Sequence, residues 1–301
     1  MNKNPEYNFN KGIENKLKGF KSYLKQSGND INTIQQKSNY TGYFLTWKEK
    51  ENLQEVTYND LLSFIGYCRE TGKTKRHINS ILRSIRNYYE YLKQKDNTII
   101  NPAANLYIRG EKRTVPHNNL PFELLEDVYI KYPAIDNRTK RNKIILGLFI
   151  YQGITTDELK RLQTDHVNLQ DGKITIPGSK RSNKRVLALK PFQVMAMHEY
   201  IEKIRPVFLL SQTDQLFISA EGCLNIKNSV HHLFRAVKLI DAQVNNAKQI
   251  RISVITYWLK HYNLRQVQYM AGHRYVSSTE RYQVNNLEGL KKEIDEYHPL
   301  K

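Results

Sequence analysis

Residues 271–283 read AGHRYVSSTERYQ and place His273 nine positions ahead of Tyr282. Between them, Ser277 and Glu280 have the spacing of a capping box, in which two side chains satisfy the free N–H groups at a helix start. This predicts a short helix over 278–284, with Tyr282 about one turn from its beginning. The chain has 20 tyrosines, and most tyrosines pack in a core or face solvent. The meaning of Tyr282 therefore depends on the residues that accompany it.

The composition indicates a soluble globular protein. The 301 residues are sufficient for two domains, and 40% of them are hydrophobic and 25% charged. Cys68 and Cys223 are the only cysteines, too few for a disulfide framework or a zinc cluster. The sequence opens with the polar stretch MNKNPEYNFNKG, and its longest apolar run, 144–151, is too short to span a bilayer. We expect a cytoplasmic protein without a membrane segment.

The charge of the chain is the first indication of a partner. Lys and Arg outnumber Asp and Glu by 47 to 29, which gives a net charge of +18. Such an excess predicts a polyanionic partner, most often nucleic acid. An anionic membrane surface is the alternative, but no single amphipathic helix concentrates the charge.

The hydrophobic periodicity predicts a helical N-terminal domain over 1–105. Its expected helices cover 8–26, 30–47, 57–72 and 74–95, and Thr57 with Asp60 forms a capping box for the third. The fourth has one apolar stripe and one face of nearly uniform charge, which favours contact with phosphates. That basic face consists of Lys73, Lys75, Arg76, Arg83 and Arg86.

The pattern changes after Asn101-Pro102. Residues 106–120 are basic and lack periodicity, so they are interpreted as a linker. A second domain, mixed α/β, is expected over 121–301, with a β-hairpin at 173–189 whose turn is basic. Its predicted helices cover 121–132, 138–152, 191–205, 225–240, 248–262, 264–271 and 278–284, and a tail extends over 286–301.

Cations, an imidazole and a tyrosine follow one another along the second domain. Lys180 and Lys184 lie in the hairpin turn, and Lys248 and Arg251 are three apart at a helix start, hence on one face. His273 and Tyr282 come after them. No cluster of carboxylates suited to Mg²⁺ and no glycine-rich phosphate loop accompanies them, so neither a metal nor a cofactor is expected.

This order resembles the tyrosine recombinase (phage integrase) family. The family's pattern is an arginine in a G-x-R-x-x-E-L segment, a lysine in a β-hairpin, H/K-x-x-R, G-H and a nucleophilic tyrosine. Here the matching stretches are GITTDEL at 153–159, Lys180, Lys248-x-x-Arg251, Gly272-His273 and Tyr282. The resemblance covers nearly the whole chain and implies a helical core-binding domain and a catalytic domain that together clamp DNA in a C shape.

The resemblance also implies a chemistry. A tyrosine hydroxyl, with a pKa near 10 in water, is a poor nucleophile at neutral pH and needs cations that stabilise the phenolate and the charge on the phosphate. Arg251 would grip the phosphate through two donors, while Lys248 and His273 would add further donors. Lys180 would protonate the leaving 5′-oxygen, and Tyr282 would hold the DNA as a 3′-phosphotyrosine.

Each of these residues also has an ordinary structural interpretation. Lys180 can be a turn lysine, Arg251 a surface phosphate contact and Tyr282 a core residue. His273 can be an imidazolium that caps a helix C-terminus.

The chain departs from the family's pattern at Thr155, which stands where the first arginine is expected. Thr155 and Glu158 have capping-box spacing, so a structural role as a helix start is available. A threonine donates one neutral hydrogen bond and cannot clamp a phosphate. Either Lys160, Arg161 or Lys184, the nearest cations in sequence, compensates, or the chain binds DNA and cuts it poorly.

The two-domain layout resembles recombinases that act on short inverted half-sites of double-stranded DNA and carry no separate arm-binding module. The tail 286–301 resembles a segment that docks on a neighbouring protomer, which implies a tetramer on paired sites. Two other functions stay open: a catalytically impaired DNA-binding regulator or accessory factor of the same fold, and a type IB topoisomerase-like enzyme that acts as a monomer.

Overall fold

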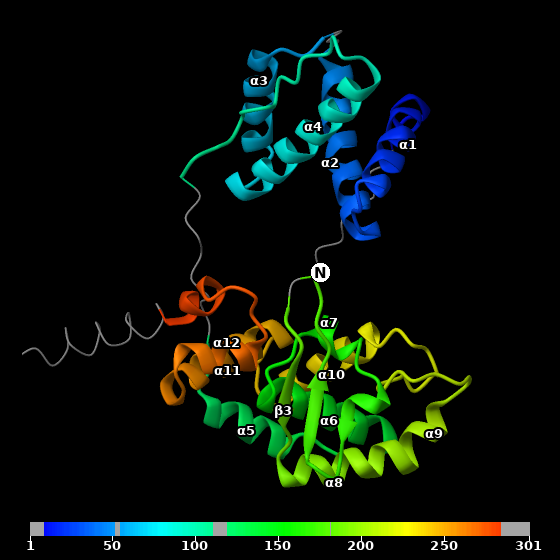
Figure 1. Ribbon diagram of the computed structural model, residues 1–301, viewed down its shortest axis with the longest axis vertical. Helices are drawn as coiled ribbons and strands as arrows, with labels where there is room; N and C mark the ends of the chain where they lie inside the picture. The colour runs from blue at the N-terminus through cyan, green and yellow to red at the C-terminus, as the bar shows by residue number, and fades with distance from the viewer. Residues whose placement is uncertain (1–8, 52–54, 111–118, 181, 284–301) are drawn as a thin grey trace, which may run out of the picture. The chain divides into compact units, whose positions relative to one another are not determined.

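The computed structural model describes residues 9–51, 55–110, 119–180 and 182–283. The chain divides into two compact units, residues 1–113 and 114–301, and each has its own hydrophobic core (Figure 1). Helices dominate both units, and a small antiparallel sheet lies in the second. The predicted fold class, mainly α with a small sheet in the second part, is confirmed. None of the helices in the described ranges is long and apolar enough to cross a lipid bilayer.

The first unit is built from helices that begin at polar caps. They are α1 (Lys11–Gln26), α2 (Ile31–Lys50), α3 (Tyr58–Glu70) and α4 (Lys75–Lys95). In each, the residue before the helix accepts a hydrogen bond from a backbone N–H of the first turn. The predicted capping box of α3 is confirmed, because Thr57 and Asp60 exchange hydrogen bonds of 2.7 and 3.3 Å. The edge of the Phe44 ring packs against Phe64 in the core between these helices.

The basic face of α4 is smaller than the sequence predicts. Arg86 is half-buried and donates to the carbonyls of Ala103 and Leu106, at 3.0 and 3.1 Å. Lys73 donates to the Tyr43 hydroxyl at 2.9 Å and lies over its ring. The remaining cations of that face are exposed, namely Lys75, Arg76 and Arg83.

The segment after α4 packs on the first unit. Leu106 is buried, and Asn79 on α4 both donates to and accepts from the backbone of Ile108, at 3.0 and 2.9 Å. Residues 106–108, assigned to a linker from the sequence, are therefore anchored to α4. Their basic, aperiodic sequence hides this anchoring because the partners are backbone groups. Residues 111–118 of the expected linker lie outside the described residues.

The second unit surrounds two buried helices. Its longer helices are α5 (Phe122–Lys131), α6 (Asn137–Tyr151), α8 (Pro191–Glu199), α10 (Lys227–Ile240), α11 (Ala247–His261) and α12 (Leu264–Ala271). Every residue of α6 from Ile144 to Ile150 is buried, and α11 packs directly against this helix. A helix apolar on all sides belongs in a core, and these two carry the loops that form the site.

The sheet contains the predicted hairpin and one further strand. β2 (Lys173–Ile176) and β3 (Arg185–Ala188) pair antiparallel, with Ile176 opposite Arg185, and β1 (Val167–Asn168) adds to β2. β1 has only two residues, too few for an alternating pattern to show in the sequence. The expected single helix over 191–205 is α8 followed by a π-helical turn, η2 (Tyr200–Ile204), and α9 (Arg205–Phe208). Pro206 has no N–H and its ring would clash with a regular preceding turn, which accounts for the wider one.

Candidate active site

The site begins at the turn between α6 and α7 (Thr156–Leu159). Gly153 has a φ of 56°, a conformation that favours glycine, and it leads the chain to Thr155 at the N-cap of α7. Thr155 Oγ1 accepts from the Glu158 N–H at 3.2 Å, and Glu158 Oε2 accepts from the Thr155 N–H at 2.8 Å and from its hydroxyl at 3.0 Å. The predicted helix-start role of Thr155 is confirmed, and its hydroxyl is already occupied by Glu158.

Arg251 projects from the second turn of α11 toward this capping box. Its guanidinium donates to the carbonyl of Gly153 and, at 2.6 Å, to that of Ala271. Arg251 Nη1 also lies 3.8 Å from Glu158 Oε2, and only 11% of the side chain is exposed. Burial lowers the pKa of Arg251, but an arginine keeps its charge in proteins. Arg251 is thus a nearly buried cation that joins three separate segments of the unit.

His273 follows α12 across Gly272, whose φ of 69° ends the helix. Its Nδ1 lies 2.8 Å from Thr279 Oγ1, and its ring stacks on that of Tyr282, with centroids 5.9 Å apart and an angle of 17° between the planes. Burial lowers the pKa of His273 to about 4, with help from Arg251 and other nearby cations. This environment favours the uncharged ring at neutral pH and does not support the interpretation of His273 as a capping imidazolium.

The helix that carries Tyr282 covers 277–283 and begins one residue earlier than expected. Its first backbone bonds run from Thr279 and Glu280 to the carbonyl of Val276, at 2.7 and 3.0 Å. Ser277 lies inside the helix, and no capping hydrogen bond joins it to Glu280 among the described residues, whereas Thr279 Oγ1 contacts His273 Nδ1. Tyr282 is half-buried and packs against the core of the second unit. The predicted tail at 286–301 lies outside the described residues.

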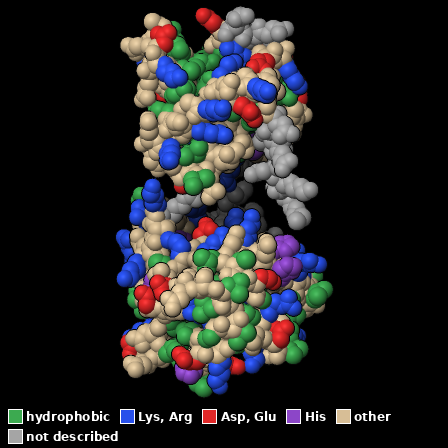
Figure 2. Space-filling view, turned by 90° about the vertical axis from the view of Figure 1, so that its right-hand side faces the viewer, with side chains coloured by type: hydrophobic (Ala, Val, Ile, Leu, Met, Phe, Trp, Pro, Cys, Tyr) green, Lys and Arg blue, Asp and Glu red, His purple; other side chains and the backbone are tan. Residues whose placement is uncertain are grey.

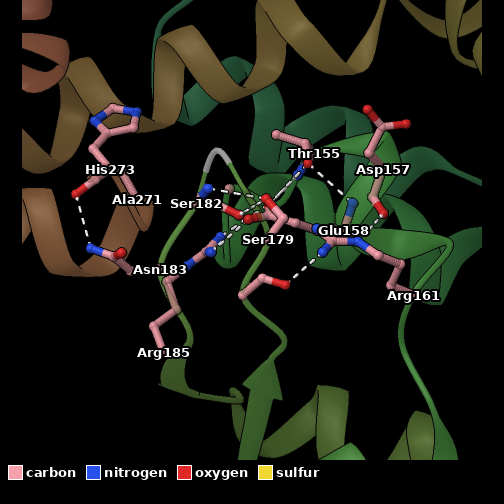
Figure 3. Close-up of polar contacts among 12 residues, drawn as sticks. Thr155, Asp157, Glu158, Arg161, Ser179, Ser182, Asn183, Arg185, Ala271 and His273 are labelled. Atoms are coloured by element: carbon pink, nitrogen blue, oxygen red, sulfur yellow. Dashed lines mark hydrogen bonds and ion pairs between the residues drawn. The ribbon is translucent and has the colours of Figure 1, made fainter. Parts of the chain in front are cut away.

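The hairpin turn is held beside His273 by hydrogen bonds to its backbone. Asn183 N–H donates to the Gly272 carbonyl at 2.9 Å, and the backbones of Ser182 and His273 pair in an isolated antiparallel β-bridge. From the other side, Arg161 Nη1 donates to the Gly178 carbonyl at 2.7 Å and Arg274 Nη2 to that of Ser179 at 3.2 Å. Figure 3 shows the turn, Arg161 and His273 together. The backbone that presents Lys180 is therefore fixed relative to His273.

The two predicted lysines do not enter this cluster. Lys180 and Lys248 are both exposed, and neither forms a hydrogen bond or ion pair with another described residue. The structure thus brings together Thr155, Arg251, His273 and Tyr282, and leaves the two lysines in solvent.

A second arginine, Arg185, lies in this cluster and is missing from the sequence prediction. Its side chain is fully buried, and its guanidinium binds both oxygens of Glu158, at 2.7 and 3.2 Å (Figure 3). A side-chain carbon on Gly272 would come within 2.4 Å of Arg185 Nη1. The available signal was its inward position in β3, where buried Leu187 follows two residues later, because a charged residue is rarely buried without a partner.

The cations considered from the sequence are engaged or exposed. Lys160 forms an ion pair with Asp157 at 3.8 Å, Arg161 holds the hairpin, and Lys184 is exposed. Compensation by one of these three cations for the missing arginine therefore stays a prediction. Within the described ranges, no group of three or more His, Cys, Asp or Glu residues is placed to hold a metal ion.

The chain matches known proteins over most of its length. The model of the phage integrase family matches residues 118–288, more than half of the chain. Tyrosine recombinase XerC of Natranaerobius thermophilus is 26% identical, with 95% of this chain and 99% of that protein covered. Tyrosine recombinase XerA of Pyrococcus horikoshii is 24% identical, with coverage of 93% and 92%.

Solved structures share the fold at lower identity. The XerH site-specific recombinase bound to palindromic difH substrate superposes with a TM-score of 0.71, at 16% identity and with 93% of this chain and 95% of that chain covered. The Tn1549 transposon integrase in complex with transposon right end DNA gives 0.66, at 14% identity and with coverage of 94% and 99%. With the order of the site residues, these matches lead to one conclusion. The chain belongs to the phage integrase family of tyrosine recombinases.

Proposed function

We propose that this protein is a site-specific DNA recombinase that cuts and rejoins DNA through a 3′-phosphotyrosine on Tyr282. The observation that carries the proposal is the stacking of Tyr282 on His273 in a cluster that also contains Arg251. A tyrosine beside buried arginines and a neutral histidine suits attack on a phosphodiester. The shared family supports recombination in general, and the residue roles are part of the proposal.

The chemistry needs one bond made and one broken. Tyr282 Oη loses its proton to solvent water and bonds to the scissile phosphorus, and the bond from phosphorus to the 5′-oxygen breaks. Arg251 stabilises the charge on the non-bridging oxygens, and neutral His273 donates one ring N–H. Lys180 supplies a proton to the leaving oxygen, and Lys248 adds a cation at the edge of the site. The ester keeps the energy of the broken bond, so a second strand can attack it without ATP, and exchange proceeds through a Holliday junction.

We further propose short inverted half-sites as the target and a tetramer on paired sites as the working assembly. The XerC and XerA relatives cover 95% and 93% of this chain, and the XerH structure contains a palindromic substrate. In this assembly the tail 286–301 would dock on the neighbouring protomer. The outcome is integration, excision, inversion or resolution, depending on how the sites are placed.

A nicked duplex tests the proposal. The duplex is taken from inverted repeats that flank the gene, and a nick near the cleavage position lets the freed 5′ end diffuse away, so the covalent species accumulates. A denaturation-resistant protein–DNA adduct is expected. Tight binding without an adduct would instead indicate a catalytically impaired regulator. Relaxation of supercoiled DNA by the monomer, without paired sites, would indicate a topoisomerase-like enzyme.

DNA binding is expected to depend steeply on salt. Lys and Arg are spread over the face of the first unit in Figure 2, and the chain carries +18 in total. Each phosphate contact releases counterions, so the logarithm of the binding constant should fall against that of the salt concentration with a slope of several units. Changing exposed Arg83 to Gln should reduce the slope by about one, whereas Arg86→Gln should not, because Arg86 holds backbone carbonyls. A flat response would contradict a DNA-facing basic surface.

Replacing Thr155 with arginine is expected to change cleavage little or to lower it. The hydroxyl that caps α7 would be lost, and the new guanidinium would enter a cluster where Glu158 already has two arginine neighbours. We expect a rate of phosphotyrosine formation within about threefold of wild type, or below it, at saturating protein. Thr155→Ser, which keeps the cap, is the matched control. A tenfold gain in Thr155→Arg would mean that no cation replaces the family's first arginine.

A further inference from the structure

Arg185 belongs to a buried charge cluster in which positive charges outnumber negative ones, unlike a simple structural ion pair. Its side chain has no solvent exposure, and Glu158, its partner, is 2% exposed. Arg251 approaches the same carboxylate from the other side, at 3.8 Å. Two guanidinium groups thus share one carboxylate, which leaves one positive charge in excess. An excess buried charge destabilises a fold, so its presence points to a use other than stability.

The Arg185 guanidinium has hydrogen-bonding capacity left over. Nη1 and Nη2 bind Glu158, but Nε is buried without a hydrogen-bond partner among the described residues. A buried donor without a partner is costly and rare in folded proteins. The orientation of Arg185 is therefore set by Glu158 and by Gly272, on which it packs, although one of its hydrogen-bond donors has no partner.

Both of these contacts lead to residues of the candidate active site. Glu158 lies between Arg185 and Arg251, so a fixed carboxylate fixes one side of Arg251. Gly272 directly precedes His273, and the close approach of Arg185 Nη1 supports the turn that presents the imidazole. Arg185 thereby supports, from β3, the two groups that the neighbouring elements present to the phosphate.

We propose that Arg185 is a positioning residue of this active centre and compensates from strand β3 for the arginine that is absent at Thr155. The proposal rests on the proposed function. Arg185 acts through Glu158 and Gly272 and does not itself touch DNA, because it is fully buried. The charge of Arg185 adds to that of Arg251 on the protein side of the proposed phosphate position. Its guanidinium binds the Glu158 carboxylate, which also accepts hydrogen bonds from Thr155.

The electrostatics of the cluster agree with this arrangement. Burial raises the pKa of Glu158, but hydrogen bonding and charge from Arg185, with the charge of Arg251, outweigh it and hold the pKa at about 2. The charged groups that face His273 are Arg251 on α11, Arg185 on β3, Arg281 on the last helix and Glu158 on α7. Burial, then Arg251, then Arg185, lowers the pKa of His273, so removal of Arg185 should raise it.

Three variants separate this role from plain stability. Arg185→Met removes both charge and fork, and Arg185→Lys keeps the charge alone. Arg141→Met is the matched control, because Arg141 is equally buried in the same unit but, among the described residues, donates to Asn142 and the Ile218 carbonyl and lies over the Phe208 ring, away from the candidate site. Each variant is assayed for thermal unfolding, DNA binding and the single-turnover rate of adduct formation on the nicked duplex, at saturating protein and over a range of pH.

We expect Arg185→Met to form the adduct about 10²-fold more slowly and Arg185→Lys about tenfold more slowly, with DNA binding retained. The acid limb of the Arg185→Met rate profile should move up by about one pH unit, and that of Arg185→Lys should not move. Arg141→Met should lose thermal stability but keep its rate once bound. A folded, DNA-bound Arg185→Lys variant with wild-type rates at every pH would overturn the proposal, even if Arg185→Met fails to fold.

A measurement of the pKa of His273 tests the role of Arg185 independently of the proposed function. The pKa of His273 is followed by NMR of the free protein, in wild type and in Arg185→Met, or in Arg185→Gln if the former does not fold. A rise of about one unit is expected. If wild type forms no adduct, the proposed function fails, while the pKa still reports whether Arg185 acts on His273. An unchanged pKa would overturn the action of Arg185 on this residue.

Discussion

Replacing Tyr282 with phenylalanine is expected to abolish the covalent protein–DNA species and to leave DNA binding unchanged. The ring remains, so its packing on the core and its stacking on His273 are kept, and only the hydroxyl proposed to attack phosphorus is lost. No other group bonded to that ring can form a phosphate ester. The measurement is the yield of denaturation-resistant adduct on the nicked duplex, beside binding of the same duplex.

The control for Tyr282 is Tyr275, the nearest other tyrosine along this stretch. Its side chain is 71% exposed and makes no ring contact with His273 among the described residues. Tyr275→Phe should form the adduct at the wild-type rate. If the adduct persists in Tyr282→Phe and disappears in Tyr275→Phe, the nucleophile is Tyr275 and the proposed geometry is wrong.

Arg251→Lys is expected to lower the rate of phosphotyrosine formation by about 10²–10³-fold, although the positive charge is retained. The planar guanidinium of Arg251 reaches the carbonyls of Gly153 and Ala271 at once and still has donors for a phosphate. A lysine ammonium is a point charge that cannot hold this fork. The loss should appear in the single-turnover rate at saturating protein, with little change in the dissociation constant for DNA.

The matched control is Arg265→Lys, because Arg265 on α12 is exposed and, among the described residues, donates only to Gln268. Thermal unfolding is measured for both variants. A lower melting temperature would indicate that α11 is displaced, whereas an unchanged one would indicate that only the hydrogen bonds to the phosphate are lost. If Arg251→Lys cleaves like Arg265→Lys, Arg251 has a structural role only, as the three segments that it joins also permit.

Much of the fold could be predicted because its signals are local. Thr57 with Asp60 and Thr155 with Glu158 mark helix starts through side chains three positions apart, and Gly272 marks a helix end. The local pattern can still fail. The Ser277–Glu280 spacing is that of a capping box, yet the helix begins at Ser277, and the side chain that contacts the site from this turn is Thr279.

The candidate site was predicted less completely, for a similar reason. Arg251, His273 and Tyr282 could be predicted because they follow one another along the chain in the order of the family's pattern. Arg185 joins them only when β3 folds against α7 and α12. An arginine in the stretch NKRVLAL has the composition of a solvated turn, and its position two residues before Leu187 is the only local sign of burial. Lys160, Arg161 and Lys184 are near Thr155 in sequence, whereas Arg185 reaches the cap of α7 in space.

The hydrogen bonds that hold the hairpin turn also link two steps of the reaction thermodynamically. The Asn183–Gly272 bond joins the hairpin that presents Lys180 to the segment that presents His273, and the Arg161–Gly178 bond joins the same hairpin to the segment after α7. DNA that moves the hairpin turn on binding must break these hydrogen bonds. The free energy of breaking them then also changes the stability of the His273 position. By reciprocity, whatever fixes the histidine alters the affinity of the turn for DNA by the same factor. Lys180, the proposed proton donor, and His273 are therefore coupled through the hairpin, and a substitution at Arg161 is expected to alter the placement of both.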